Sequence, residues 1–231
     1  MLALNAQPFM PPFMRLLFLV LLATSPCTWA ADLPPAETQA LLKSLQEHRV
    51  KFPTLIADFT EQKSTHLLTK PLISEGTLSF QVPNKFRREV KGSSPSLTVS
   101  DGAKLWIYSP AFKEAELYTI GQRQFFDDSI AALTAGLNFQ NVEKFYTCTA
   151  AREADGYRLA LTPRMGGLRR MVKELAVFVD AEFKMQRTET TLPKGDRLVT
   201  TYKNQRPAAL PAGTFDFTPP ADARISQPLG K

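Results

Sequence analysis

Residue types that commonly build enzyme active sites and metal centres are scarce in this sequence. It contains only two histidines, His48 and His66, and two cysteines, Cys27 and Cys148, among 231 residues. Neither histidine belongs to a metal-ligand spacing such as HExxH, and no GxSxG, P-loop or GxGxxG stretch occurs. A catalytic triad that uses one histidine stays an alternative, because its members need not be adjacent in sequence. We expect a protein that is not an enzyme and that uses no metal or cofactor.

Long hydrophobic runs are missing apart from one near the N-terminus. The run Leu16 to Ala23 follows Arg15, the only charged residue of the first thirty, and is too short to span a bilayer. A polar stretch and the small residue Ala30 come next, as in secretory signal peptides. We therefore predict that residues 1–30 are a signal peptide cleaved after Ala30, with a signal anchor as the alternative.

The predicted cleavage leaves residues 31–231 as a single domain with one cysteine. Cys27 is preceded by a proline, where a lipoprotein signal needs a small residue, so we expect a released product. Only Cys148 stays in the mature chain, and no intrachain disulfide can form there, although an exported protein could contain one. The start codon, Met1 or Met14, stays open.

Patterns typical of β-strands dominate the mature chain. Alternating apolar and polar residues predict short strands that are joined mostly by hairpin-sized turns, one of them at a Gly-Gly pair at residues 166–167. Their regular spacing indicates an antiparallel sandwich or barrel, a mainly β fold. The expected strands lie at residues 55–62, 76–82, 85–90, the hairpin at 96–111, 115–120, 157–163, 173–180, 184–192, 197–204 and 213–220.

Two segments, residues 36–49 and 125–137, have the apolar spacing of amphipathic helices. A proline pair opens the first helix, and Gly136 suits the C-terminal end of the second. Each helix needs an apolar surface on which to lie. The apolar stripes contain Leu41, Leu42, Leu45, Phe126, Ile130 and Leu133.

The hairpin at residues 96–111 is unusual because its second arm has no polar face. A strand with one wet face alternates apolar and polar residues, whereas residues 105–108 read LWIY. If the Asp-Gly pair between the arms makes a two-residue turn, Thr98 pairs with Leu105. Leu105 and Ile107 then lie on one face and the two aromatic residues on the other, so both faces need a cover.

Positive charge is concentrated in two segments, FRREVK and PRMGGLRRMVK, in a chain of net charge +6. An exported protein rarely meets nucleic acid, so we expect no nucleic-acid partner. A solvated rim, attraction to anionic lipid and attraction to an acidic protein stay open as interpretations.

Five segments together resemble a known family. ADFTEQK, GTLSFQVPNKFRREV, LTVSDGAKLWIYSP, LALTPR and GTFDFTPP occur in the order in which the outer-membrane lipoprotein carrier (LolA) family has them, and the resemblance covers nearly the whole mature chain. It implies an incomplete, strongly curved antiparallel β-barrel with amphipathic helices as a lid over a hydrophobic cavity. It also implies a monomeric periplasmic chaperone that receives acylated lipoproteins from an inner-membrane ABC-type release complex and passes them to an outer-membrane acceptor.

Strand parity and the two helical stripes predict which residues bind the lipid, and a register slip of one residue would exchange the two faces of each strand. Many family members have an arginine where Val82 stands here, and there it is thought to control closure of the lid. Arg88 has the same strand parity, and we predict that it takes this gating role. The alternatives are a paralogue that carries another lipid or glycolipid, and a periplasmic lipoprotein sensor. The predicted lipid-binding residues are Leu41, Leu45, Phe80, Val82, Phe86, Leu105, Ile107, Phe126, Ile130 and Leu133.

Overall fold

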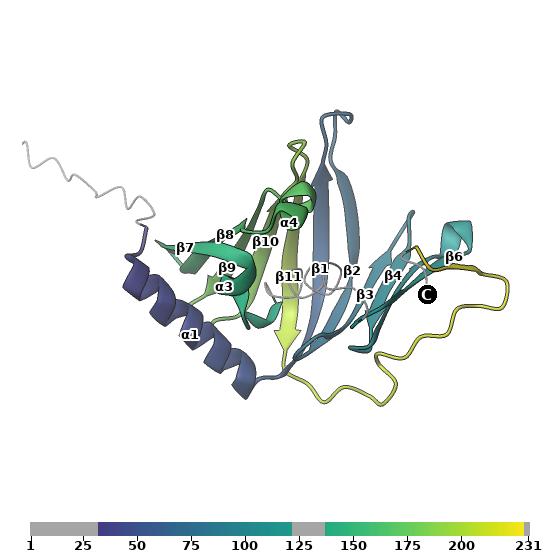
Figure 1. Ribbon diagram of the computed structural model, residues 1–231, viewed down its shortest axis with the longest axis horizontal. Coiled ribbons are helices and arrows are strands. Elements are labelled where there is room, and N and C mark those ends of the chain that lie inside the picture. Colours follow the sequence, from purple (N-terminus) through teal and green to yellow (C-terminus); the bar gives the residue numbers. More distant parts are fainter. Residues whose placement is uncertain (1–31, 122–136, 229–231) are drawn as a thin grey trace, which may run out of the picture.

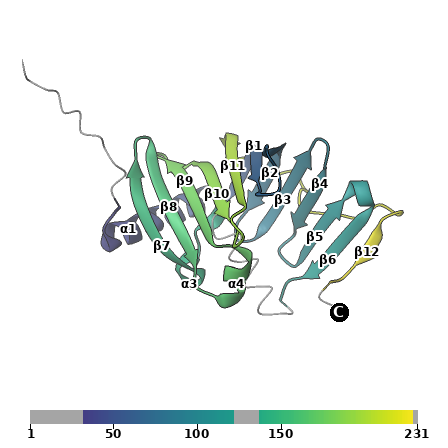
Figure 2. The same cartoon turned by 90° about the horizontal axis from the view of Figure 1, so that it is seen from above.

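Twelve strands form one open, curved sheet (Figures 1 and 2). The computed structural model describes residues 32–121 and 137–228. Within these ranges the strand order is β12-β6-β5-β4-β3-β2-β1-β11-β10-β9-β8-β7, and the two end strands do not pair with each other. The predicted mainly β architecture with an unclosed, curved sheet is therefore confirmed. The predicted signal peptide and the stripe of the second predicted helix lie outside the described residues.

Neighbouring strands are antiparallel, except that β12 runs parallel to β6. The helices are α1 (Pro35–Lys51), η2 (Pro110–Phe112), α3 (Val142–Phe145) and α4 (Gly166–Met171). The strands are β1 (Thr54–Ser64), β2 (Leu72–Gln81), β3 (Lys85–Lys91), β4 (Ser96–Ser100), β5 (Lys104–Ser109), β6 (Glu114–Thr119), β7 (Tyr146–Glu153), β8 (Gly156–Pro163), β9 (Glu174–Asp180), β10 (Met185–Thr191), β11 (Arg197–Arg206) and β12 (Arg224–Ser226).

The first helix, α1, forms where its apolar spacing predicts. Proline occupies its first turn, Glu37 lies near its N-terminus, and basic side chains fill its last turn, so its ends complement the helix dipole. Pro53 follows, and a proline cannot continue the helix. The stripe of Leu41, Leu42 and Leu45 is buried against the sheet.

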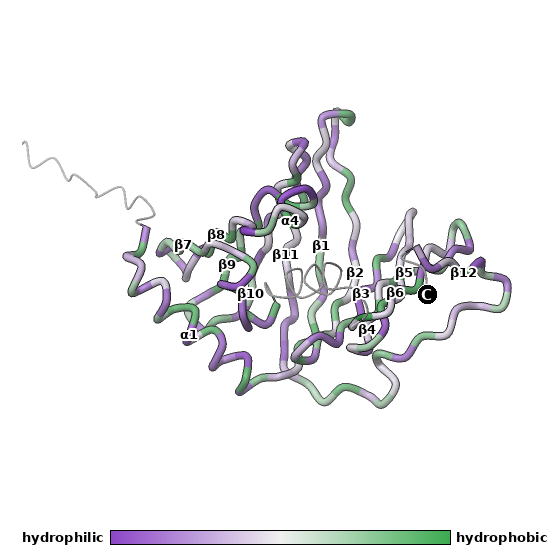
Figure 3. The backbone as a smooth tube through the Cα atoms, viewed as in Figure 1, coloured by the Kyte–Doolittle hydropathy of each residue, from purple (hydrophilic) through white to green (hydrophobic). Residues whose placement is uncertain are grey.

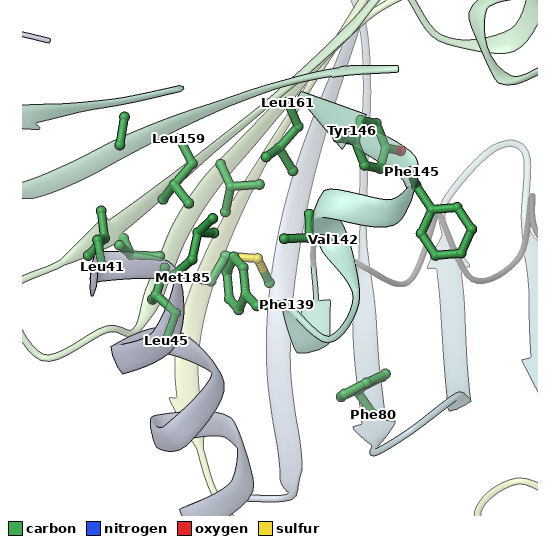
Figure 4. Packing of buried hydrophobic residues seen from close by; sticks show 14 of the residues in the cluster. Leu41, Leu45, Phe80, Phe139, Val142, Phe145, Tyr146, Leu159, Leu161 and Met185 are labelled. Atoms are coloured by element: carbon green, nitrogen blue, oxygen red, sulfur yellow. The ribbon is translucent and has the colours of Figure 1, made fainter. Parts of the chain in front are cut away.

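The main core lies between α1 and the β7–β10 part of the sheet. Figure 4 shows Leu41 and Leu45 of α1 pointing toward Leu159 of β8 and Met185 of β10, with Phe139 between them. The amide of Gln46 donates to the carbonyl oxygen of Phe139 at 2.9 Å and so ties the helix to this loop. These contacts fix α1 across one end of the concave face.

The β4–β5 hairpin corrects the predicted turn while keeping the predicted faces. Three residues, 101–103, connect the two strands. Ser100 pairs with Leu105, and Thr98 pairs with Ile107 instead of Leu105. The Asp101 carboxylate causes the longer loop, because it accepts the backbone N–H groups of residues 103 and 104 at 2.7 and 2.6 Å. The register differs from the predicted one by two residues, which preserves side-chain parity. Leu105 and Ile107 therefore do share one face.

The C-terminal segment covers the other face of β5. The expected strand at residues 213–220 does not form; this segment is a turn followed by extended chain without ladder partners. It runs from the end of β11 across to β6 (Figure 1). The ring of Phe217 lies 5.8 Å from that of Trp106 and 5.6 Å from that of Tyr108. The alternation at Phe215 and Phe217 thus reflects packing on a sheet, and it was misread as a strand.

Several other segments differ from the predictions, β7 and α4 among them, and η2, α3 and β12 were not predicted. β7 was not expected, because its residues include the small Ala150 and Ala151, which have weak strand preference. The Gly166-Gly167 pair begins the short helix α4 instead of a tight turn, and burial of Leu168 holds that helix against the sheet.

The β1–β2 hairpin extends past the neighbouring strands (Figure 1), and its tip is apolar (Figure 3). Leu67 and Ile73 there are 81% and 70% exposed. No described helix is long and apolar enough to cross a membrane.

Candidate ligand-binding cavity

An apolar cavity of about 330 Å³ lies on the concave face of the sheet. Its volume is at the lower end of the roughly 300–1,000 Å³ typical of ligand pockets. Strands from both halves of the sheet contribute to it, so its shape depends on the curvature. The lining residues are Phe59, Leu78, Phe86, Arg88, Thr98, Leu105, Ile107, Leu137, Tyr146, Val172, Leu175, Thr188, Thr190 and Tyr202.

Strand parity explains why these side chains point inward. Phe86 and Arg88 are two residues apart on β3, and Leu105 and Ile107 are two apart on β5. Side chains two residues apart lie on the same face of a strand. On the opposite face of β5, Trp106 packs against the C-terminal segment. One face of the LWIY stretch is therefore covered by the chain itself, and the other lines the cavity.

The most polar feature of the cavity wall is an ion pair between β3 and β1. Arg88 Nη2 donates to Glu61 Oε2 at 2.7 Å, and the hydroxyl of Thr200 donates to the same oxygen at 3.2 Å. The Arg88 guanidinium also lies 4.4 Å from the ring centroid of Phe59, a cation–π distance. Arg88 is among the residues that line the cavity, and Glu61 is not.

Gly76, on the strand between them, leaves room for this arrangement. A Cβ atom at Gly76 would lie 2.0 Å from the backbone carbonyl oxygen of Glu89 on β3 and 2.5 Å from the Phe59 ring, both far inside contact distance. Because Gly76 has no side chain, the ring of Phe59 lies over β2, and Arg88 reaches across the same strand to Glu61. The absence of one side chain thus allows an aromatic ring and a salt bridge to share one site.

Hydroxyl groups line the far wall of the cavity. The hydroxyls of Tyr202 and Thr188 lie 3.4 Å apart and share a hydrogen bond. Burial raises the pKa of the Tyr202 phenol, so it stays protonated at neutral pH. Within the described ranges, no group of three or more His, Cys, Asp and Glu residues could hold a metal ion. The hydroxyls of Tyr202 and Thr188 can bind a polar atom of a ligand by hydrogen bonds.

The structure brings four of the predicted site residues to the cavity. Phe86, Leu105 and Ile107 line it together with Arg88. The only hydrogen-bond partner of Arg88 among residues 32–121 and 137–228 is Glu61. Lipid binding by these side chains, and gating by Arg88, stay predictions.

The other predicted site residues are not among the lining residues. Leu41, Leu45 and Phe80 are buried in the adjacent core, and Val82 is partly buried against it. Beside Val82, Asn138 donates its amide N–H to the carbonyl oxygen of Pro83 at 2.7 Å. Three predicted lid residues lie outside the described residues: Phe126, Ile130 and Leu133.

Several lining residues were missed from the sequence. Phe59 and Leu78 had a usable signal, because each lies two residues from another apolar residue of its strand and so shares a face with it. Thr188, Thr190 and Tyr202 had none, because polar residues in a strand are normally assigned to solvent. Only the pairing of β10 with β11 and of β11 with β1 places them inside.

Taken together, the fold and the site define an open, curved antiparallel sheet that holds an apolar cavity on its concave face. The chain belongs to the family of outer membrane lipoprotein carrier protein LolA, whose family model matches residues 50–218. The family resemblance seen in the sequence is therefore confirmed.

Individual relatives agree with this assignment. The chain is 32% identical over 173 residues to an outer-membrane lipoprotein carrier protein of Dechloromonas aromatica (strain RCB), covering 74% of this chain and 80% of that protein. It is 26% identical over 215 residues to the protein of the same description in Xylella fastidiosa (strain 9a5c), covering 92% of this chain and 95% of the relative.

Solved structures whose backbone is similar to that of this chain include a LolA superfamily protein from Nitrosomonas europaea. That match has a TM-score of 0.44 at 12% identity and covers 78% of this chain and 97% of the other. A protein from Thermus thermophilus matches with a TM-score of 0.49 at 13% identity and covers 83% of this chain and 99% of the other. Both likenesses are too distant to carry an argument about the site.

Proposed function

We propose that this protein is a periplasmic chaperone that binds the acyl chains of lipoproteins and carries them from the inner to the outer membrane. The observation that carries the proposal is the apolar cavity on the concave face, in a chain of the lipoprotein carrier family. Its partners would be an inner-membrane ABC-type release complex and an outer-membrane acceptor. Binding and release need no covalent step.

The energetics support a cavity for this task. Burial of an acyl chain gains about 0.8 kcal/mol per methylene, so an acylated protein does not cross water unaided. A carrier must bury that chain and also shield its own apolar wall, because large exposed apolar patches promote aggregation. The curved sheet provides walls for such a site, and α1 buries the part of the sheet beside it.

A second candidate is a carrier of another lipid or glycolipid. Two observations favour it: Val82 stands where many family members have an arginine, and an ion pair of Arg88 with Glu61 forms part of the cavity region. The first feature removes a charge that many family members have, and the second adds an ion pair at a mostly apolar wall.

Mass spectrometry of material that co-purifies with the full chain, expressed in a bacterium with two membranes, tests the proposal. Ile107→Glu places a charge on the cavity wall and is expected to abolish co-purification. Ile73→Glu makes the same change at the exposed hairpin tip and serves as the matched control. Acylated protein bound to the control but not to Ile107→Glu supports lipoprotein carriage. Free lipid or glycolipid in its place favours the second candidate, and equal material on both variants contradicts cavity binding.

A further inference from the structure

We infer that Arg88 and Glu61 form a net-neutral polar subsite, which selects acyl chains attached through an ester or amide carbonyl over ionised fatty acids. The inference rests on the proposed function, because it assumes that an acyl chain occupies the cavity. It adds a chemical rule for the group at the head of that chain.

The guanidinium of Arg88 has hydrogen-bond donors to offer to a ligand. A guanidinium carries five N–H groups, and Glu61 is the only hydrogen-bond acceptor that Arg88 contacts within the described ranges. The Arg88 side chain is 29% exposed and lines the cavity. Its position over the Phe59 ring and its bond to Glu61 hold it in place, so little freedom is lost when a ligand binds.

The charge of this subsite is already balanced before any ligand arrives. Glu61 accepts from both Arg88 and Thr200 and is 19% exposed, so it is a fixed, half-buried carboxylate. A carbonyl oxygen accepts an N–H of Arg88 without adding charge. A fatty acid carboxylate would bring a second negative charge to a single guanidinium beside apolar walls, and that charge would stay uncompensated.

Ester- and amide-linked chains share this neutral carbonyl whether they come from an acylated protein or from a membrane lipid. The hydroxyls of Thr98 and Thr188 line the same cavity and are further hydrogen-bond donors for a ligand. The subsite therefore recognises the linkage of the acyl chain, while the apolar wall binds its hydrocarbon part.

Displacement of a neutral environment-sensitive dye from the full chain at pH 7.5 measures the preference. The competitors are dodecanoic acid, its methyl ester, its N-methyl amide and an N-dodecanoyl peptide. The wild-type protein should bind the ester and amide at least about tenfold more tightly than the acid, because like charges in contact are strongly disfavoured. A tighter N-dodecanoyl peptide than methyl ester would indicate acylated protein as the source.

Glu61→Gln is the decisive variant, because it keeps the shape of the side chain and leaves the charge of Arg88 unbalanced. It should bring the ratio of ester to acid affinity to one or below. Glu189→Gln makes the same charge change on β10. Glu189 forms an ion pair with Arg197 at 2.7 Å and is not among the residues that line the cavity, so this variant should leave the ratio unchanged. An equal ratio in all three proteins overturns the subsite while leaving the lipid cavity standing. If no competitor displaces the dye from the wild-type protein, cavity binding and the subsite both fail.

Discussion

The rings of Trp106 and Phe217 meet edge to face, with their centroids 5.8 Å apart, although they belong to the fifth strand and to the C-terminal segment. Such contacts between aromatic rings add to the free energy gained by burial alone. The outer face of β5 is therefore covered by the protein's own chain. Its inner face lines the cavity through Leu105 and Ile107.

Phe217→Ala should loosen this cover. Phe217 is half-buried, so we expect a loss of about 1–3 kcal/mol in the free energy of unfolding, less than for a fully buried phenylalanine. Trp106 is the sole tryptophan of residues 31–231, and its fluorescence should shift to longer wavelength as water reaches the ring. Urea unfolding measures the first effect. Phe112→Ala, at a 77% exposed position, should change neither quantity. An unshifted spectrum in Phe217→Ala would mean that the segment does not cover Trp106 in solution.

Gly76→Ala should disturb the cavity wall from within the sheet. The added methyl group would lie 2.0 Å from the carbonyl oxygen of Glu89 and 2.5 Å from the Phe59 ring. Both the β3 backbone and the ring must therefore shift, and Arg88 loses the surface on which it rests. We expect a loss of about 1–3 kcal/mol, the usual cost of overpacking, and weaker dye binding in the cavity.

The matched control for this change is Gly166→Ala. A Cβ atom at Gly166 has no neighbour within 4 Å, and this residue begins the short helix α4. Alanine there should be neutral or slightly stabilising. Equal stability of Gly76→Ala and the wild-type protein would show that the backbone at Glu89 and the ring of Phe59 can both shift without cost.

Local patterns predict the elements that bury one stripe or one face. Alternation locates β2 and the helical stripe of Leu41 and Leu45 locates α1, because both periods are written into consecutive residues. β7 escapes such a pattern because its small alanines are selected by close packing under α1. The pair of Arg88 and Glu61 is also unpredictable, because it joins two strands across a third and depends on the missing side chain of Gly76.

The cavity wall was predicted in part for the same reason. Parity places Phe86, Leu105 and Ile107 on the concave face, because the register between β4 and β5 differs from the predicted one by two residues and not by one. It cannot tell the part of that face that α1 buries from the part that stays open. Phe80 therefore has the correct parity but lies in the core.

Alkaline pH should destabilise the protein through two neighbouring groups on β7. Burial raises the pKa of Tyr146 to about 12 and that of the Cys148 thiol to about 11, from ordinary values of 10.0 and 9.0. The folded state therefore holds these protons more tightly than the unfolded state. Stability is complete below pH 9 and is lost as the pH rises through 11 to 12. Urea unfolding at pH 8, 10 and 11 checks the trend, and the double variant Tyr146→Phe with Cys148→Ala should flatten it.

The same burial should make Cys148 unreactive. With a pKa of about 11, only about one thiol in a thousand is ionised at pH 8, and the thiolate is the reactive form. An aromatic disulfide reagent should label the native protein much more slowly than the protein in urea. Fast labelling of the native state would show that β7 opens readily.

Arg49→Met should leave the protein as stable as the wild type or stabilise it by about 1 kcal/mol. Arg49 is only 5% exposed, its Nε atom has no hydrogen-bond partner in the part of the chain that the structure describes, and burial lowers the pKa of its guanidinium. The folded state thus disfavours the charged form, and the ring of Phe80 at 5.9 Å offsets only part of that cost. Methionine keeps the length of the side chain and removes the charge. Lys43→Met, at a position of α1 whose side chain is 77% exposed, should change the free energy of unfolding by less than about 0.5 kcal/mol. A loss of more than about 1 kcal/mol in Arg49→Met would show that the cation–π contact and the bond of Arg49 to the carbonyl oxygen of Phe52 outweigh the desolvation of the charge.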